Sequence, residues 1–227
     1  RFLEKRMSET RKNLVIPLLT LLVAFPFGIL VAGPFGNWMA EWLHRGIMAL
    51  CGFSPVLMGV LIGGLWQVLV SVGIHGIITV LAFADVLAGN SSPLLALSYS
   101  ASFAVSGVAF AVFMRSRNSG EKQTAKAGAV SAIMGATEPA MYALIKPDKK
   151  RFALCCAGGA LGGATAGFFG ISMHAYAGMG ITGLFGFFQT GDVKLVGVLL
   201  MAVLPFGFTW LIEMLLYRQE KAVESEE

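Results

Sequence analysis

GATEPAMY, residues 135–142, is the stretch that decides how this chain can fold. It places one carboxylate, Glu138, and one helix-breaking residue, Pro139, inside a run from Ala127 to Ile145 that is otherwise apolar or small. Hydrocarbon tolerates neither a bare carboxylate nor unpaired backbone groups, so both must be buried in protein or in a watery cavity. We therefore predict a re-entrant hairpin over residues 127–145 that presents Glu138 to a polar substrate.

Composition places the whole chain in a membrane. Its 227 residues are 56% hydrophobic and 13% charged, with a mean hydropathy of +0.73, whereas soluble domains are about 25% charged. The net charge of +4 does not indicate nucleic acid, because the basic residues fall in loops between apolar segments. The three cysteines have no CxxC spacing and no adjacent histidine, so we expect neither a metal site nor a disulfide framework: Cys51, Cys155 and Cys156.

The pattern of apolar segments predicts an all-α, polytopic membrane protein with re-entrant hairpins and an amphipathic interfacial helix. Leu14–Gly33 can span, with a kink at Pro26, and Asn37–Leu50 has one apolar face. The expected order is a cytoplasmic flank (1–12), a helix plus the interfacial helix (13–53), a first broken segment around His75 (54–92), a helix (93–114), the hairpin (127–145), two helices (152–216) and a polar tail (217–227).

The glycine-rich helix at residues 152–173 carries several small-xxx-small pairs, which predicts tight packing on a neighbouring helix. The apolar but glycine-broken stretch that follows, residues 173–189, is expected to form an ordered extracellular loop or a partial re-entry.

Loop charge supports the hairpin. Arg115–Lys126 and Lys146–Arg151 each contain four Lys or Arg residues, so both ends of the Glu138 segment should be cytoplasmic. The block Ser54–Ala84 must then begin and end outside, either as two crossings or as a second hairpin of opposite sense. Two broken segments that meet near the midplane are typical of a transporter binding site.

Two side chains are candidates for chemistry. Glu138 could accept hydrogen bonds, or a proton, from sugar hydroxyls; the alternative is a buried glutamate that only caps or pairs. His75 lies at the centre of the first broken segment, flanked by glycines. As imidazole it could orient a hydroxyl, and as imidazolium it could stabilise phosphoryl charge; the alternative is a structural histidine.

Four further residues are candidates for substrate binding. At the hairpin tip, Gly135 can cap the first half-helix and Thr137 can N-cap the second. Gln67 and Asp85 could line a polar cavity. No metal ligand is assigned.

GATEPAMY resembles the G-[IA]-T-E-P-A-[IL]-[FY] signature of enzyme IIC components of the sugar phosphotransferase system, glucose superfamily. GGLWQ at residues 63–67, with GIH at 73–75, is similar to the G-G-L-W-Q…G-[LI]-H stretch of its β-glucoside, sucrose and trehalose branch. GGALGG at residues 158–163 fits the glycine-rich helix that follows in this family. The chain is identified as the C-terminal part of such a component.

This resemblance implies group translocation across the bacterial inner membrane. The sugar binds from outside, and a phosphocysteine on the IIB domain phosphorylates its 6-hydroxyl, with Glu138 and His75 in contact with the sugar near that hydroxyl. No cofactor is implied, because the donor is phospho-IIB and ultimately phosphoenolpyruvate. The implied partners are the IIB and IIA domains, membrane lipid, the preceding IIC helices and a second copy in a homodimer; nucleic acid is not among them.

The chain departs from the family pattern in places. Gly76 follows His75 where this branch often has Trp or His, and neither the IIB motif C-x-T-R-L-R nor a IIA domain is found. The chain, which begins at Arg1 with a charged segment, is thus expected to be a piece that binds sugar but phosphorylates nothing alone. Aromatic β-glucosides are the preferred substrates, ahead of sucrose, trehalose or an amino sugar. The alternatives are an ion-coupled secondary sugar transporter and a non-transporting membrane sensor or packing module.

Overall fold

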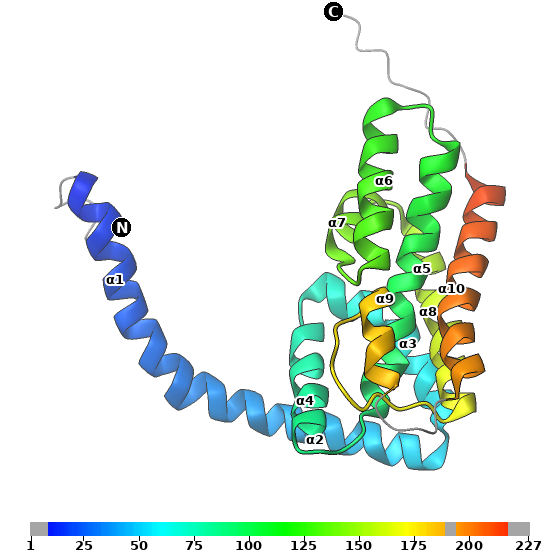
Figure 1. Ribbon diagram of the computed structural model, residues 1–227. Helices are drawn as coiled ribbons and strands as arrows, with labels where there is room; N and C mark the ends of the chain where they lie inside the picture. Colours follow the sequence, from blue (N-terminus) through cyan, green and yellow to red (C-terminus); the bar gives the residue numbers. More distant parts are fainter. Residues whose placement is uncertain (1–8, 189–193, 218–227) are drawn as a thin grey trace, which may run out of the picture. The chain divides into compact units, whose positions relative to one another are not determined.

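The computed structural model describes residues 9–188 and 194–217, which are helical apart from turns and one isolated bridge between Ser92 and Met173. The chain divides into two units, residues 1–46 and 47–227 (Figure 1). Five helices in the described part are long and apolar enough to cross a membrane, which confirms the prediction of an all-α, polytopic protein: Leu18–Phe35, Pro55–Val72, Pro93–Arg115, Lys149–Phe169 and Leu195–Leu216. The predicted flank at 1–12 and tail at 217–227 lie largely outside the described residues.

The first unit is built from one long helical run. Helix α1 (Glu9–Phe27) passes through a π-helical turn (Gly28–Ala32) into α2 (Gly33–Phe53), where separate spanning and interfacial helices had been expected. Pro26 cannot donate to the preceding turn, and the Pro34 ring would clash with the carbonyl four residues earlier. The wider π turn, in which Gly33 N–H donates to Gly28 O, lies directly before Pro34 and lets the helix continue through this proline, while α1 continues through Pro26.

The second unit is a bundle around α5. The helices before and including it are α3 (Pro55–Val72), α4 (His75–Leu87) and α5 (Pro93–Arg115). Those after it are α6 (Ser119–Ile133), α7 (Glu138–Ala140) with a π-helical turn (Met141–Ile145), α8 (Lys149–Phe169), α9 (Gly180–Gly183) with a 3-10 turn (Leu184–Phe187), and α10 (Leu195–Leu216). Almost every residue of α5 is buried, because α3, α6, α8 and α10 surround it.

Local sequence sets the helix starts. Ser54 and Ser92 each accept a backbone N–H in front of a proline at the first helical position. Asn118 accepts from Gly120 N–H at 2.9 Å and Glu121 N–H at 3.1 Å. The region expected to be a basic loop up to Lys126 is therefore helical from Ser119, and the first arm of the Glu138 hairpin is longer than predicted.

Glycines let α3 and α8 touch backbone to backbone, as the small-xxx-small pairs predicted. A Cβ on Gly163 would lie 2.0 Å from Gly59 O, and one on Gly63 would lie 2.1 Å from Gly159 O. Two further glycines of α8 face the other side, Gly158 against Thr209 and Gly162 against Ser100. Helix α8 is thus held by α3, α5 and α10 along its length.

A cluster of charges joins three helix ends. The Arg151 side chain, 13% exposed, lies 2.9 Å from Glu213 Oε1 and 3.3 Å from Glu121 Oε1. Glu121 Oε2 accepts from the hydroxyls of Ser116 at 2.7 Å and Tyr217 at 2.9 Å. The start of α6, the start of α8 and the end of α10 therefore lie together, so the hairpin leaves and returns at the same end of the bundle.

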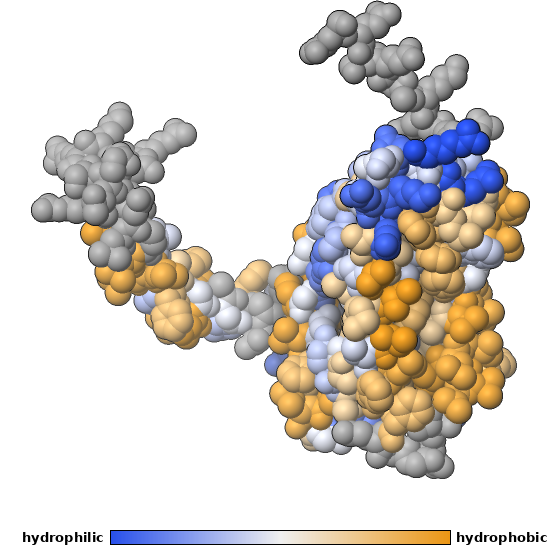
Figure 2. Space-filling model, turned by 45° about the horizontal axis from the view of Figure 1, so that its top comes forward, coloured by the Kyte–Doolittle hydropathy of each residue, from blue (hydrophilic) through white to orange (hydrophobic). Residues whose placement is uncertain are grey.

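Hydrophilic side chains gather at this end of the second unit, whereas hydrophobic ones cover its flank (Figure 2). The cations on the helix ends and turns there are exposed: Arg115, Arg117, Lys122, Lys126, Lys149 and Lys150. This is the distribution expected of the cytoplasmic side of a membrane protein.

The α3–α8 seam should not accept a side chain. We expect Gly163→Leu to destabilise the protein by about 1–3 kcal/mol or more, because the added atoms must separate two backbones. Gly207→Leu in α10 is the matched control, since a Cβ there meets nothing within 4 Å. Thermal unfolding in detergent measures the difference, and equal melting temperatures would contradict the packing.

The pKa of Glu121 should make stability depend on pH. Burial raises the pKa of this carboxyl, but hydrogen bonds from Ser116 and Tyr217 and the charge of Arg151 outweigh burial, and the pKa falls below its ordinary value of 4.5. A carboxyl whose pKa is lower in the folded state stabilises the protein above the unfolded pKa, and that stability is lost as the pH falls through the folded pKa.

Glu121→Gln should therefore lower the melting temperature at neutral pH and flatten its fall on acidification. Glu41→Gln, which removes an exposed ion pair with Arg45, should leave the pH profile as it is. If both variants show the same dependence of melting temperature on pH as the wild type, Glu121 does not contribute to stability in this way.

Candidate functional site

The Glu138 hairpin turns at Gly135. This glycine has φ +105, a left-handed conformation that side chains disfavour. Gly135 N–H donates to Ala132 O at 2.9 Å, and Ala136 N–H donates to Ser131 O at 3.0 Å, so the last carbonyls of α6 are paired. The Ser131 hydroxyl in turn donates to Ala136 O. Gly135 thus caps α6 as predicted from its position.

The second arm starts at Glu138, with Pro139 in its first turn. Thr137 is at the N-cap position, but its side chain makes no capping hydrogen bond, contrary to our expectation. The reason is its backbone, φ −86 and ψ −19, which is helical, whereas a hydroxyl cap needs an extended residue. The Thr137 side chain is buried instead. The two arms pack closely, since a Cβ on Gly128 would lie 2.9 Å from Ala140 Cβ.

The first broken segment has a defined break. Helix α3 ends at Gly73, with φ +84, whose N–H donates to Leu69 O and Val70 O at 3.0 Å each. Helix α4 begins two residues later at His75. Figure 1 shows α3 and α4 running antiparallel, with the turn between them beside α7. His75 is thereby placed at the turn rather than within a spanning helix.

The structure brings His75 and Glu138 together. Nε2 of His75 lies 3.7 Å from Oε1 of Glu138, with the two side chains 28% and 50% exposed. The Trp66 ring and the His75 imidazole are arranged edge to face, with their ring centroids 6.2 Å apart. Nδ1 of His75 is buried and has no hydrogen-bond partner among the described residues. A carboxylate and an imidazole side by side, both partly exposed, can bind hydroxyl groups.

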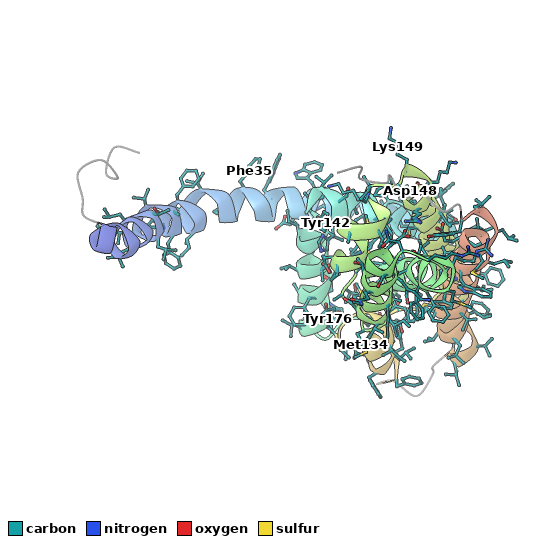
Figure 3. The ribbon with its side chains drawn as sticks, turned by 90° about the horizontal axis from the view of Figure 1, so that it is seen from above. Phe35, Met134, Tyr142, Asp148, Lys149 and Tyr176 are labelled. Carbon is teal, nitrogen blue, oxygen red and sulfur yellow. The ribbon has the colours of Figure 1, made fainter. Side chains whose placement is uncertain are left out.

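Two residues that the sequence did not single out fasten this pair. The Tyr142 hydroxyl donates to Val70 O and the Lys146 ammonium donates to Ser71 O, both at 3.3 Å. Lys146 also lies 5.1 Å from the centre of the Tyr142 ring, which is labelled in Figure 3. We call these contacts the Tyr142–Lys146 clasp. The spacing of four from Glu138 to Tyr142 to Lys146 is a signal that could have found them, because such residues share a helical face.

The other predicted site residues lie apart from the pair. Gln67 is fully buried, and its Nε2 donates to Ala101 O of α5 at 3.2 Å. Trp66 contacts His75, but Gln67, the next residue in α3, points about 100° away around the helix. Asp85 is in the same helix as His75 but ten residues later, a rise of roughly 15 Å. The structure thus joins Glu138, His75 and the turn that carries Gly135 and Thr137, and places Gln67 and Asp85 elsewhere.

No group of three His, Cys, Asp or Glu residues within 9–188 and 194–217 is placed to hold a metal ion.

Comparison with known proteins gives a single family. The family model of the phosphotransferase system EIIC domain matches residues 1–159. The chain is 32% identical, over 84% of its length, to the β-glucoside-specific EIIBCA component of Halalkalibacterium halodurans, of which it covers 30%. It is 28% identical, over 99% of its length, to the arbutin-, cellobiose- and salicin-specific EIIBC component of Escherichia coli, of which it covers 47%.

The sucrose-specific EIIBC component of Salmonella typhimurium is also similar, at 27% identity over 94% of this chain and 47% of that protein. The chain thus spans less than half of the length of these curated relatives. No solved structure gives a significant match. The family model covers most of the chain, and the relatives carry the same domain, so the chain belongs to the EIIC family of integral membrane components of the phosphotransferase system.

Proposed function

We propose that this chain binds and translocates the sugar in a phosphoenolpyruvate-dependent phosphotransferase system, and that phospho-IIB phosphorylates the sugar's 6-hydroxyl. The observation that carries the proposal is the meeting of His75 and Glu138, 3.7 Å apart, from two broken helical segments far apart in sequence. Polar groups at helix breaks between spanning helices are where transporters bind substrates.

In the proposed reaction, the sugar O6–H loses its proton, the S–P bond of the IIB phosphocysteine breaks, and an O6–P bond forms. Glu138 accepts the hydrogen bond, and then the proton, of the hydroxyl. His75 orients the same hydroxyl or, as imidazolium, stabilises the charge on the transferred phosphoryl group. The Glu138 side chain is half exposed, which leaves room for the sugar beside its carboxylate.

The Glu138 hairpin re-enters from the cytoplasmic side in this proposal. Helix α6 has 15 residues and rises about 21 Å, short of the roughly 30 Å hydrocarbon core. The ion pair of Glu121 and Arg151 joins the two ends of the hairpin at the basic end of the bundle. Glu138 therefore lies inside the membrane, within reach of a phosphorylated domain on the cytoplasmic side. The partners are IIB and IIA, fused or separate, and the full-length protein is a homodimer.

A β-glucoside is the proposed substrate. The relatives from Halalkalibacterium halodurans and Escherichia coli, which are named for β-glucosides and for arbutin, cellobiose and salicin, are 32% and 28% identical to this chain. Sucrose-specific relatives are 27% and 26% identical to this chain, which makes sucrose the competing substrate.

Glu138→Gln should reduce phosphoenolpyruvate-dependent sugar phosphorylation by about 100-fold or more, because loss of a general base typically costs this much. The assay uses the full-length transporter in vesicles with IIB and IIA supplied, and Glu41→Gln is the control. If Glu138→Gln retains full activity, the site assignment is wrong. Uptake that follows an ion gradient and ignores phosphoenolpyruvate would instead support a secondary transporter.

A sugar panel in the same vesicles tests the substrate class. We expect salicin and arbutin to be phosphorylated with a higher kcat/KM than sucrose or trehalose. Mass spectrometry of the product reports the modified hydroxyl. A product phosphorylated away from the 6-position, or a preference for sucrose, would overturn this part of the proposal.

A further inference from the structure

We infer that the turn Gly178–Gly180, in the segment between α8 and α10, positions Glu138 by contacting the tip of its hairpin. The inference rests on the proposed function, since it concerns where the carboxylate is held for the sugar. Figure 1 shows α9, which follows this turn, lying beyond the ends of α6 and α7. The Gly178–Gly180 turn meets the tip of the hairpin, which includes Met134, labelled in Figure 3.

The two turns meet backbone to backbone. A Cβ on Gly180 would lie 2.2 Å from Ile133 O and 2.4 Å from Gly135 N. In return, a Cβ on Gly135 would lie 2.4 Å from Met179 O. Gly135 and Gly180 are both left-handed, with φ +105 and +64. No side chain fits between the turns, so any residue other than glycine at 180 must move one turn away from the other.

The Gly178–Gly180 turn is itself held firmly. The Thr182 hydroxyl donates to Met179 O at 2.9 Å. A Cβ on Gly183 would lie 2.8 Å from the Tyr99 ring of α5, so α9 lies directly against that ring. At the base of the segment, Met173 and Ser92 exchange backbone hydrogen bonds of 2.8 and 3.0 Å. The turn is therefore anchored to the N-terminal part of α5.

The Glu138 hairpin is anchored to the other part of the same helix. Ser106 of α5 donates to Ala129 O of α6 at 3.0 Å, and the Arg151 cluster fixes the start of α6 beyond the end of α5. The two tips thus approach from opposite ends of one buried helix and stop where their glycines touch. Because Glu138 is only three residues after Gly135, this contact sets how far the carboxylate reaches toward His75.

Gly180→Ala in the full-length transporter, with IIB and IIA supplied, tests the inference. We expect kcat/KM for sugar phosphorylation to fall on the order of tenfold to 100-fold, because displacements of about 1 Å at a reacting group have such effects. Gly89→Ala is the matched control: Gly89 is also left-handed, with φ +82, but a Cβ there meets nothing within 4 Å. Backbone strain is common to both variants, whereas displacement of the hairpin is specific to Gly180→Ala.

Thr182→Val provides a test without added bulk. It removes the hydrogen bond that holds Met179, while Thr182→Ser keeps the hydroxyl. We expect Thr182→Val to lower kcat/KM severalfold and Thr182→Ser to restore it. This pair keeps the inference testable if Gly180→Ala does not accumulate in the membrane.

A second readout does not depend on sugar transfer. With Cys51, Cys155 and Cys156 replaced by serine, Ala136→Cys at an exposed position reports the hairpin tip through its rate of maleimide labelling. The rate should change in Gly180→Ala and stay constant in Gly89→Ala. Equal kcat/KM and equal labelling rates in these two variants would overturn the positioning role, even if Glu138→Gln is inactive. Conversely, a changed labelling rate with an active Glu138→Gln would uphold the contact and reject the function.

Discussion

Backbone groups in hydrocarbon must find partners within the protein, and this constraint is met at the two helix breaks that carry the candidate site. At Gly73 the broken turn is closed by one N–H that reaches two carbonyls, and at Gly135 by bonds back to Ala132 and Ser131. Both breaks are therefore closed by specific hydrogen bonds, and together they carry the candidate site.

Much of the fold follows from local sequence. Ser-Pro at residues 54–55 and 92–93 marks two helix starts, and Gly73 marks the break before His75, because caps and left-handed glycines have clear residue preferences. The continuous helix through Gly33 and Pro34 could not be predicted from the sequence, because a π turn that accommodates a proline has no distinctive composition. The start of α6 at Ser119 was not predicted either, because the charged residues there suggest a loop, whereas the Asn118 cap starts a helix.

The site was predictable in part for a similar reason. Glu138 and His75 stand out because ionisable groups are costly in an apolar segment. Tyr142 and Lys146 were missed because they bind main-chain carbonyls, which any residue provides. Gln67 has the same polarity as a site residue, but the glycine seam of α3 and α8 decides which face of α3 turns inward, and that depends on the partner helix.

The Tyr142–Lys146 clasp has an evolutionary consequence. Its acceptors are the carbonyls of Val70 and Ser71, so the side chains at these two positions can change while the bonds persist. The hairpin and the α3–α4 break can thus stay in register while their surroundings diverge. A lineage could alter the lining next to the carboxylate and imidazole, and with it the range of sugars accepted, without first rebuilding the frame that holds them.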